Sequence, residues 1–281
     1  MAGKSLHNTK ALPNTLDEIQ EVLQPLIDDP AGTIIFLDLD GTIVPIMRRP
    51  EDVVLAPAMG RLIRTLAHMY LSVTIVSGRP ATEAKRITGN SEIAIIGNHG
   101  FETLLPGHAA MVCDEAQPHV PDVRELVKYL KSLLPTVDLG ITVDDKTATA
   151  SIHYRRAGDP ERALAFIRGK IYPLIEKLGL EAREGRMVVD VRPPVAIDKG
   201  VAVGRMMDRI NASKAIYAGD DTTDVDALKE LRRRRRKKQV VVGIGVISDE
   251  MPGELPRYSD LMVERVSGIE TVLQILAGEE P

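Results

Sequence analysis

Short apolar runs and helical repeats of apolar residues alternate along the first hundred residues. Residues 34–37, 72–78 and 92–98 are largely apolar, as expected of parallel strands that are buried on both faces. Residues 15–28 and 57–70 place apolar side chains at helical spacing, and the second of these segments begins with a proline. Alternating strands and helices predict a parallel sheet with helices on its faces.

The pattern changes in the middle of the chain. Residues 121–134 form a strongly amphipathic helical pattern, and residues 147–155 (TATASIHYR) alternate between apolar and polar side chains. Such alternation is typical of an antiparallel sheet with one solvent-exposed face. A helix over 159–178 and a strand over 187–191 are expected next. The middle of the chain is therefore predicted to be a separate α+β unit inserted into the parallel one.

The first pattern returns after Lys199. We expect a helix, three strands and a closing helix, over 201–210, 214–221, 240–246, 261–266 and 269–276. The predicted fold is α/β, with a core from 1–103 and 189–281 and an inserted unit over 104–188.

Composition narrows the class of protein. The 281 residues are 44% hydrophobic and 27% charged, which is ordinary for a soluble globular protein. The formal net charge of −4 argues against a nucleic-acid-binding domain. The single cysteine, Cys113, excludes an internal disulfide and a multi-cysteine metal site. We find neither an apolar run long enough to span a bilayer nor a signal peptide, so we expect a cytoplasmic monomer that binds neither membranes nor nucleic acid.

A dense basic run, RRRRRKK at 232–238, is the main exception to this picture. Such a run could bind nucleic acid or an acidic membrane surface. It lies between a helix and the next predicted buried strand, however, and a solvated loop is the simpler prediction.

Four polar clusters follow the predicted strands. They are Asp38-Leu39-Asp40, Ser77-Gly78-Arg79, Asn98-His99-Gly100 and Gly219-Asp220-Asp221. In parallel α/β sheets, ligands bind outside the carboxyl ends of the strands. Asp38 and Asp40 face the same side because they are two residues apart on an extended strand, and Asp220 can join them from another strand. Three carboxylates without a matching cation require a metal, and oxygen ligands favour Mg²⁺.

The same clusters supply the groups that phosphoryl transfer needs. Lys199 could add a fixed positive charge, while Ser77 and the backbone amides near Gly78 could hold an anion. Asp38 could attack phosphorus to form an aspartyl phosphate, and Asp40 could act as general acid and base. Each motif alone is more often a turn, a loop or a helix cap. All four in this order at strand ends favour a catalytic site over a catalytically silent binding domain.

These motifs resemble those of the haloacid dehalogenase-like phosphatase superfamily. DLDGT (38–42), Ser77, Lys199 and GDDTTD (219–224) correspond, in that order, to its four motifs. The segments GNHG, SIHYR, GRMVVDVRP and GDDTTDVDA, at 97–100, 151–155, 185–193 and 219–227, are similar to those of trehalose-6-phosphate phosphatases. The resemblance covers roughly residues 33–250.

The resemblance implies a fold, an activity and a set of site residues. The fold would be a Rossmann-like core with a mobile inserted cap that recognises the substrate. The enzyme would hydrolyse trehalose 6-phosphate to trehalose and phosphate. Mg²⁺ would be held by the Asp38 carboxylate, the Asp40 backbone carbonyl and Asp220, and Asp221 and Asp224 would support its water network. Ser77, Gly78 and Lys199 would bind the phosphoryl group. The residues expected to bind the sugar are Arg79, Asn98, His99, Arg155, Arg186 and Asp190.

Two positions at which this chain departs from the family pattern leave the identity of the sugar open. Members of the family often have Lys and Glu where this chain has Arg186 and Asp190. Arginine differs from lysine in hydrogen-bond geometry, and aspartate is one carbon shorter than glutamate. The alternative substrates are sucrose phosphate and a glycosyl phosphoglycerate.

Overall fold

The chain forms two compact units. The computed structural model describes residues 15–47, 49–185, 187–248 and 251–280. The first unit takes the described residues up to Ile75, then Ile87–Ile93, then those from Lys199 onward; the second takes Val76–Arg86 and Ala94–Asp198. The second unit extends beyond the inserted segment of 104–188 at both ends, and the boundaries expected for a core and a cap stay a prediction.

The first unit is built on a parallel sheet. Its strand order is β12-β11-β10-β1-β2. The bounds are β1 Thr33–Asp38, β2 Ser72–Val76, β10 Lys214–Gly219, β11 Val240–Ile247 and β12 Leu261–Glu264. β1, β10, β11 and β12 pair in parallel in this sequence of neighbours. Every residue of β1 is buried, which agrees with the prediction that this apolar run is a strand covered on both faces.

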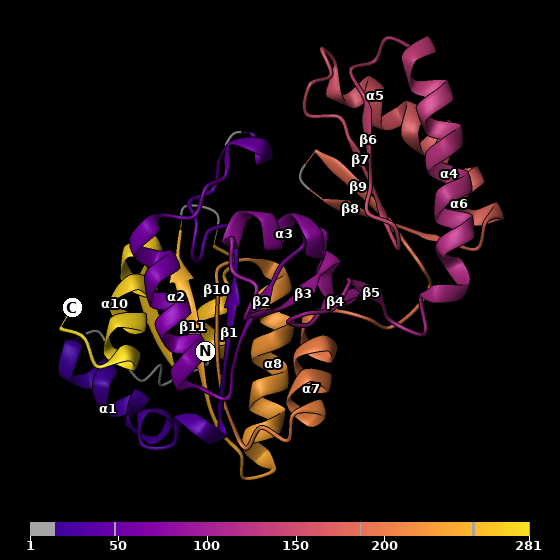
Figure 1. The fold of residues 1–281 in the computed structure, drawn as a ribbon. Coiled ribbons are helices and arrows are strands. Elements are labelled where there is room, and N and C mark those ends of the chain that lie inside the picture. The colour runs from indigo at the N-terminus through magenta and orange to yellow at the C-terminus, as the bar shows by residue number, and fades with distance from the viewer. Residues whose placement is uncertain (1–14, 48, 186, 249–250, 281) are drawn as a thin grey trace, which may run out of the picture. The chain divides into compact units, whose positions relative to one another are not determined.

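Helices pack on this sheet, with α7 against α8 and α2 against α10 (Figure 1). The bounds are α1 Leu16–Ile27, α2 Pro57–Met69, α7 Lys199–Arg209, α8 Thr222–Arg236, α9 Leu255–Tyr258 and α10 Arg265–Ala277. α1 begins with a capping box between Thr15 and Glu18, and α8 with one between Asp221 and Asp224. Among the described residues, none of the helices is long and apolar enough to cross a membrane.

The second unit begins with α3 and three antiparallel strands. The bounds are α3 Ala81–Thr88, β3 Ala94–Gly97, β4 Glu102–Leu104 and β5 Met111–Val112. β4 pairs with both β3 and β5.

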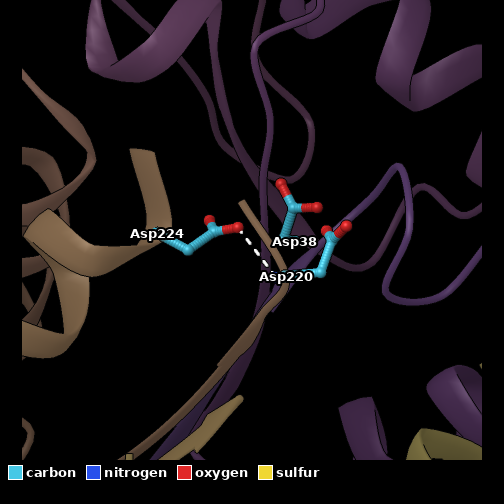
Figure 2. A group of neighbouring side chains, drawn as sticks. All are labelled: Asp38, Asp220 and Asp224. Carbon is cyan, nitrogen blue, oxygen red and sulfur yellow. Dashed lines mark hydrogen bonds between the residues drawn. The ribbon is translucent and has the colours of Figure 1, made fainter. Parts of the chain in front are cut away.

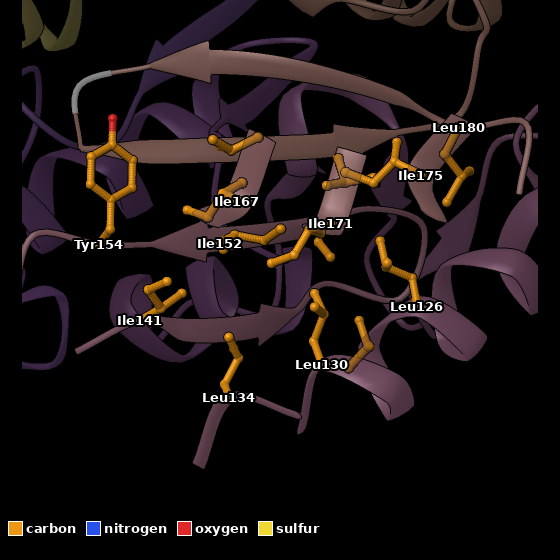
Figure 3. Close-up of a cluster of buried hydrophobic side chains, with 14 of the residues drawn as sticks. Leu126, Leu130, Leu134, Ile141, Ile152, Tyr154, Ile167, Ile171, Ile175 and Leu180 are labelled. Atoms are coloured by element: carbon orange, nitrogen blue, oxygen red, sulfur yellow. The ribbon is translucent and has the colours of Figure 1, made fainter. Parts of the chain in front are cut away.

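A four-stranded antiparallel sheet follows, in the order β6-β7-β9-β8. Its strands are β6 Thr142–Asp145, β7 Ala150–His153, β8 Glu181–Gly185 and β9 Val188–Arg192, and its helices are α4 Val120–Leu133, α5 Pro160–Phe166 and α6 Tyr172–Lys177. Apolar side chains of the helices and strands form one core, which includes Leu126, Leu130, Ile152, Ile167 and Ile171 (Figure 3). A π-helical turn, Ile167–Ile171, joins α5 to α6 and interrupts the single helix predicted over 159–178. Pro173 lies at the start of α6, where its missing N–H prevents regular α-helical pairing.

The prediction of one wet face on β7 is wrong in part. Ala150 and Ile152 are buried on the apolar face as predicted, but Thr149 and Ser151 on the other face are also buried, at 7% and 1% exposure. Their hydroxyl groups donate to Asn98 Oδ1 at 2.6 Å and to Asp190 Oδ1 at 2.5 Å. These hydrogen bonds satisfy the polar groups and permit their burial.

The prediction of a solvated loop for the basic run is also wrong in part, because only Lys237 and Lys238 lie in an exposed turn and the arginines before them are helical. Residues 232–236 form the end of helix α8, and Arg234 is only 4% exposed. Its guanidinium donates to Asp208, to Glu230 and to the carbonyl of Gly204. Arg235 forms an ion pair with Asp260. Acidic partners on the same helix and on other elements therefore hold these arginines, and a helix C-terminus favours positive charge.

Candidate active site

Three buried carboxylates meet at the carboxyl end of the parallel sheet. Asp38 ends β1, Asp220 follows β10, and Asp224 lies in the first turn of α8 (Figure 2). Each offers a carboxylate oxygen within 4.8 Å of the others. Their exposures are 4%, 4% and 0%. The structure thus brings together Asp38 and Asp220, as predicted from strand ends, and adds Asp224.

Two glycines make room for this cluster. Gly41 has φ +89°, and a Cβ built on it would lie 2.2 Å from Asp220 Oδ2. A Cβ on Gly219 would lie 2.3 Å from Asp224 Cγ. Both distances are far below van der Waals contact, so the motifs DLDGT and GDD need glycine at these positions. Asp40 lies between Asp38 and this turn and forms a bridge with Val44.

Lys199, at the start of α7, is the cation of the cluster. Its Nζ donates to Asp38 Oδ1 and to Asp224 Oδ1, both at 2.6 Å, and the residue is 3% exposed. Asp224 Oδ1 also accepts from the Tyr217 hydroxyl at 2.5 Å. Asp224 Oδ2 accepts the backbone N–H groups of Asp220 at 3.0 Å and Asp221 at 2.9 Å. Four donors fill the acceptor sites of the Asp224 carboxylate, which makes it an anchor for Lys199.

The cluster carries excess negative charge. Burial raises the pKa of Asp38 well above its usual value; the charge of Asp224 adds to this shift, and Lys199 opposes it. Burial, with the charges of Asp224 and Asp221, raises the pKa of Asp220 to about 7. Burial lowers the pKa of Lys199, but Asp224 and Asp38 outweigh burial and the net pKa is raised. One lysine thus faces three carboxylates, and a hard divalent cation would relieve the remaining repulsion.

The predicted phosphate-binding loop lies in the second unit. Ser77 is fully buried, and its Oγ accepts the backbone N–H of Arg79 at 3.1 Å. The N–H of His99 donates to the Ser77 carbonyl at 3.0 Å. A Cβ on Gly78 would lie 2.5 Å from the His99 ring. The structure therefore brings Ser77, Gly78 and Arg79 together with His99, as predicted.

Asn98 connects this loop to the segment before β7. Its Nδ2 donates to the Lys146 carbonyl at 3.0 Å, and the Lys146 ammonium donates to the Gly78 carbonyl at 3.3 Å. Asn98 and His99 have φ values of 52° and 55°, in the left-handed region that non-glycine residues seldom adopt. Such backbone strain is common at functional sites.

The sugar-binding candidates fall on and near the four-stranded sheet. Asp190 lies on β9, and Arg155 is exposed just after β7. Arg186 lies outside the described residues. The register places Asp144 opposite Ser151, Ser151 opposite Asp190 and Asp190 opposite Arg183. Paired residues share a face of a sheet, so these four form a polar row across it.

Several of these residues were not predicted from the sequence. In the sequence, Tyr217 is one more residue of a predicted apolar strand, and its contact with Asp224 depends on the fold. Asp144, Ser151 and Arg183 join Asp190 through strand register. Knowledge of which antiparallel strands pair, and in what register, would have identified them.

Comparison with known proteins identifies the family. A model of the trehalose-phosphatase family matches residues 36–260, which is well over half of the chain. The chain belongs to the trehalose-phosphatase family. It is similar to the probable trehalose-phosphate phosphatase H of Arabidopsis thaliana, at 27% identity over 259 residues, covering 86% of this chain and 71% of that protein. It spans 59–64% of the next three curated relatives.

Solved structures agree on the fold. A trehalose-6-phosphate phosphatase related protein superimposes with a TM-score of 0.72 at 23% identity, over 87% of this chain and 97% of that one. A haloacid dehalogenase-like hydrolase from Bacteroides thetaiotaomicron gives a TM-score of 0.57 at 13% identity, over 86% of this chain and 98% of that one. The predicted α/β class and the predicted family are confirmed.

Proposed function

We propose that this chain is a phosphatase that hydrolyses trehalose 6-phosphate to trehalose and phosphate. The observation that carries the proposal is the buried Asp38–Lys199–Asp224 arrangement at the carboxyl end of the sheet, in a chain of this family. Asp38 is the nucleophile: a carboxylate oxygen bonds to phosphorus, and the bond from phosphorus to the sugar oxygen breaks.

Asp40 is the general acid and base. It donates a proton to the departing sugar oxygen and then takes one from the water that hydrolyses the aspartyl phosphate. Lys199 offsets the charge of the phosphoryl oxygens while it is itself fixed by Asp224. Ser77 and the backbone amides near Gly78 are the groups of the second unit that we propose for phosphate binding.

Mg²⁺ fits the donor set of the first unit. The carboxylates of Asp38 and Asp220, with the Asp40 backbone carbonyl, would hold it, whereas the Asp224 carboxylate is already engaged by four donors. Asp221 would support the water molecules around the metal, whereas Asp224, expected in the same role, would instead hold Lys199. When bound, Mg²⁺ supplies positive charge to the phosphoryl oxygens and lowers the repulsion between Asp38 and Asp220.

The inserted cap supplies recognition of the sugar. Trehalose carries many hydroxyl groups, and selectivity for them requires charged or amide partners. Asp190, Arg155 and Arg186 are the cap residues proposed for this role, and Arg79, Asn98 and His99 are proposed to contact the substrate from the phosphate-binding loop. The polar row through Asp190 supports the assignment of that sheet face.

Phosphate release across a panel of substrates tests the proposal. The panel contains trehalose 6-phosphate, sucrose phosphate, a glycosyl phosphoglycerate, glucose 6-phosphate and a small aryl phosphate, each with Mg²⁺ and with EDTA. We expect the highest kcat/KM for trehalose 6-phosphate, and loss of turnover in EDTA. A preference for sucrose phosphate or the phosphoglycerate would refute trehalose 6-phosphate as the substrate, whereas the proposed phosphatase chemistry would stand. Undiminished turnover in EDTA would remove the metal from the mechanism.

A cap variant tests recognition separately. Asp190→Ala should narrow the kcat/KM gap between trehalose 6-phosphate and glucose 6-phosphate, and affect the aryl phosphate far less. Glu176→Ala removes an exposed carboxylate from α6 in the same unit, and is the matched control. An unchanged gap in Asp190→Ala would show that Asp190 does not contact the sugar. The expected monomeric state and cytoplasmic location stay predictions.

A further inference from the structure

Tyr217 is a fully buried tyrosine in the middle of β10, where the sequence alone suggests an apolar residue. It lies opposite Phe36 in the pairing of β10 with β1, and the two ring centroids are 6.4 Å apart. The neighbouring strand thus restricts the tyrosine ring. The phenol oxygen lies 2.5 Å from Asp224 Oδ1.

Asp224 links Tyr217 to the proposed nucleophile. Its Oδ1 accepts from both the Tyr217 hydroxyl and the Lys199 ammonium, and Lys199 in turn donates to Asp38 Oδ1. The backbone N–H groups of Asp220 and Asp221 hold the other oxygen, Oδ2. Removing the phenol hydroxyl would leave Oδ1 with Lys199 as its only remaining side-chain donor among these contacts. The backbone contacts fix Oδ2, whereas Tyr217 fixes the direction in which Oδ1 faces Lys199.

We propose that Tyr217 is a positioning residue: through Asp224 it holds the Lys199 ammonium against the Asp38 carboxylate. The kinetic consequence rests on the proposed phosphatase function, whereas the placement of Lys199 does not. The proposed role requires no contact of Tyr217 with substrate or metal. Its effect on the reaction comes from keeping Lys199 where the phosphoryl oxygens develop charge.

The competing explanation is that the hydroxyl only satisfies its own burial. Tyr70 provides a matched control for this explanation in the same unit. It is 5% exposed, and its hydroxyl donates to the carbonyl of Leu276 at 2.9 Å, away from the carboxylate cluster. Tyr217→Phe and Tyr70→Phe therefore delete the same atom from two buried tyrosines. Far-ultraviolet circular dichroism and thermal unfolding establish that each variant is folded.

Kinetics on the best substrate of the panel give the first test. We expect Tyr217→Phe to lower kcat on the order of 10- to 100-fold, as small displacements of catalytic groups do, while KM changes by less than about threefold. Tyr70→Phe should lose thermal stability and keep the wild-type kcat. A wild-type kcat in Tyr217→Phe, or an equal fall in both variants, would overturn the proposal.

Nuclear magnetic resonance of ¹⁵N-lysine gives a test that needs no turnover. The Lys199 signal is assigned by its loss in Lys199→Met, and the spectra are recorded in EDTA. In Tyr217→Phe, we expect a shifted Lys199 ammonium signal and faster exchange of its protons with water; in Tyr70→Phe we expect neither. An unchanged signal in Tyr217→Phe overturns the proposal, even in an active enzyme. A changed signal in a protein that releases no phosphate from the panel supports the positioning role and refutes the proposed function.

Discussion

Removing the charge of Asp220 should make the metal-free protein more stable at high pH. The side chain is 4% exposed, and burial together with Asp224 and Asp221 raises its pKa from 3.8 to about 7. Asp220→Asn keeps the size of the side chain and an oxygen that can accept from the Thr42 hydroxyl, which lies 3.4 Å from Asp220 Oδ1. The substitution removes the titration and one carboxylate ligand of the proposed metal site.

The sign and size of this change in stability follow from the pKa values of Asp220 in the unfolded and in the folded chain. Below about pH 4, Asp220 is protonated in both folded and unfolded chains, and its titration has no effect on stability. As the pH rises toward 7, the unfolded chain releases the proton and the folded one retains it, so the wild type loses about 1.4 kcal/mol per pH unit. Above pH 7 the loss is complete, at about 4 kcal/mol for a shift of about three units.

Urea unfolding in EDTA at pH 5 and pH 8 measures this effect. We expect the free energy of unfolding of Asp220→Asn to exceed that of the wild type by about 4 kcal/mol at pH 8 and by less than half of that at pH 5. The Asp220 charge contributes to the raised pKa of Asp38, so its removal lowers that pKa and adds to the stabilisation at high pH in the same direction. Glu21→Gln, which removes an exposed carboxylate from α1, is the control and should show the same small difference at both pH values.

Mg²⁺ should reverse the order of stability of the wild type and Asp220→Asn. Added at pH 8, it should stabilise the wild type more than Asp220→Asn, because the variant has lost one carboxylate ligand. A stability difference that does not change between pH 5 and pH 8 would refute the reasoning, since it would show that the ionised Asp220 carboxylate is not destabilising in the fold.

Two further predictions concern the nucleophile and the basic run. Asp38→Asn should lower kcat by several orders of magnitude in a folded protein, because an amide does not attack phosphorus; a tenth of the wild-type activity would refute the role of Asp38. Arg234→Met should lower the free energy of unfolding by about 3 kcal/mol, because it removes the buried guanidinium that pairs with Asp208 and Glu230 and donates to the Gly204 carbonyl. Arg236→Met, at an exposed position of the same run, should change the free energy of unfolding by less than about 0.5 kcal/mol, as measured by urea unfolding. Equal losses in the two variants would show that the buried contacts of Arg234 are not stabilising.

Local patterns were sufficient for the elements of the parallel sheet and for its motifs. The apolar run before Asp38 is a buried strand, and Pro57 begins a helix as its position suggested. Glycines in the motifs were also informative, because Gly41 and Gly219 stand where any side chain would collide with a carboxylate. The rule that ligand sites form at the carboxyl ends of parallel strands correctly predicted that Asp38 and Asp220 lie together.

Two exposed edge strands were not predicted from the pattern of apolar residues. β6 and β8 are the outer strands of the four-stranded sheet, and most of their residues are exposed and the others half-buried. An edge strand with charged side chains has little apolar periodicity to detect. The burial of Ser151 in the same sheet was not predicted either, because it depends on the hydrogen bond that its hydroxyl donates to Asp190 on β9.

Sequence alone determined which residue types stand at the strand ends, because strand formation and turns depend on near neighbours in the chain. Only the tertiary structure decided their partners. Lys199 contacts Asp38 across 161 positions and Asp224 across 25, and neither separation has a local signature. Arg234 is buried because Asp208, 26 positions away, supplies the opposite charge. Burial and hydrogen bonding of charged groups depend on such distant partners, and for that reason the hydrogen bonds of Asp224 with Tyr217 and Lys199 appeared only in the folded chain.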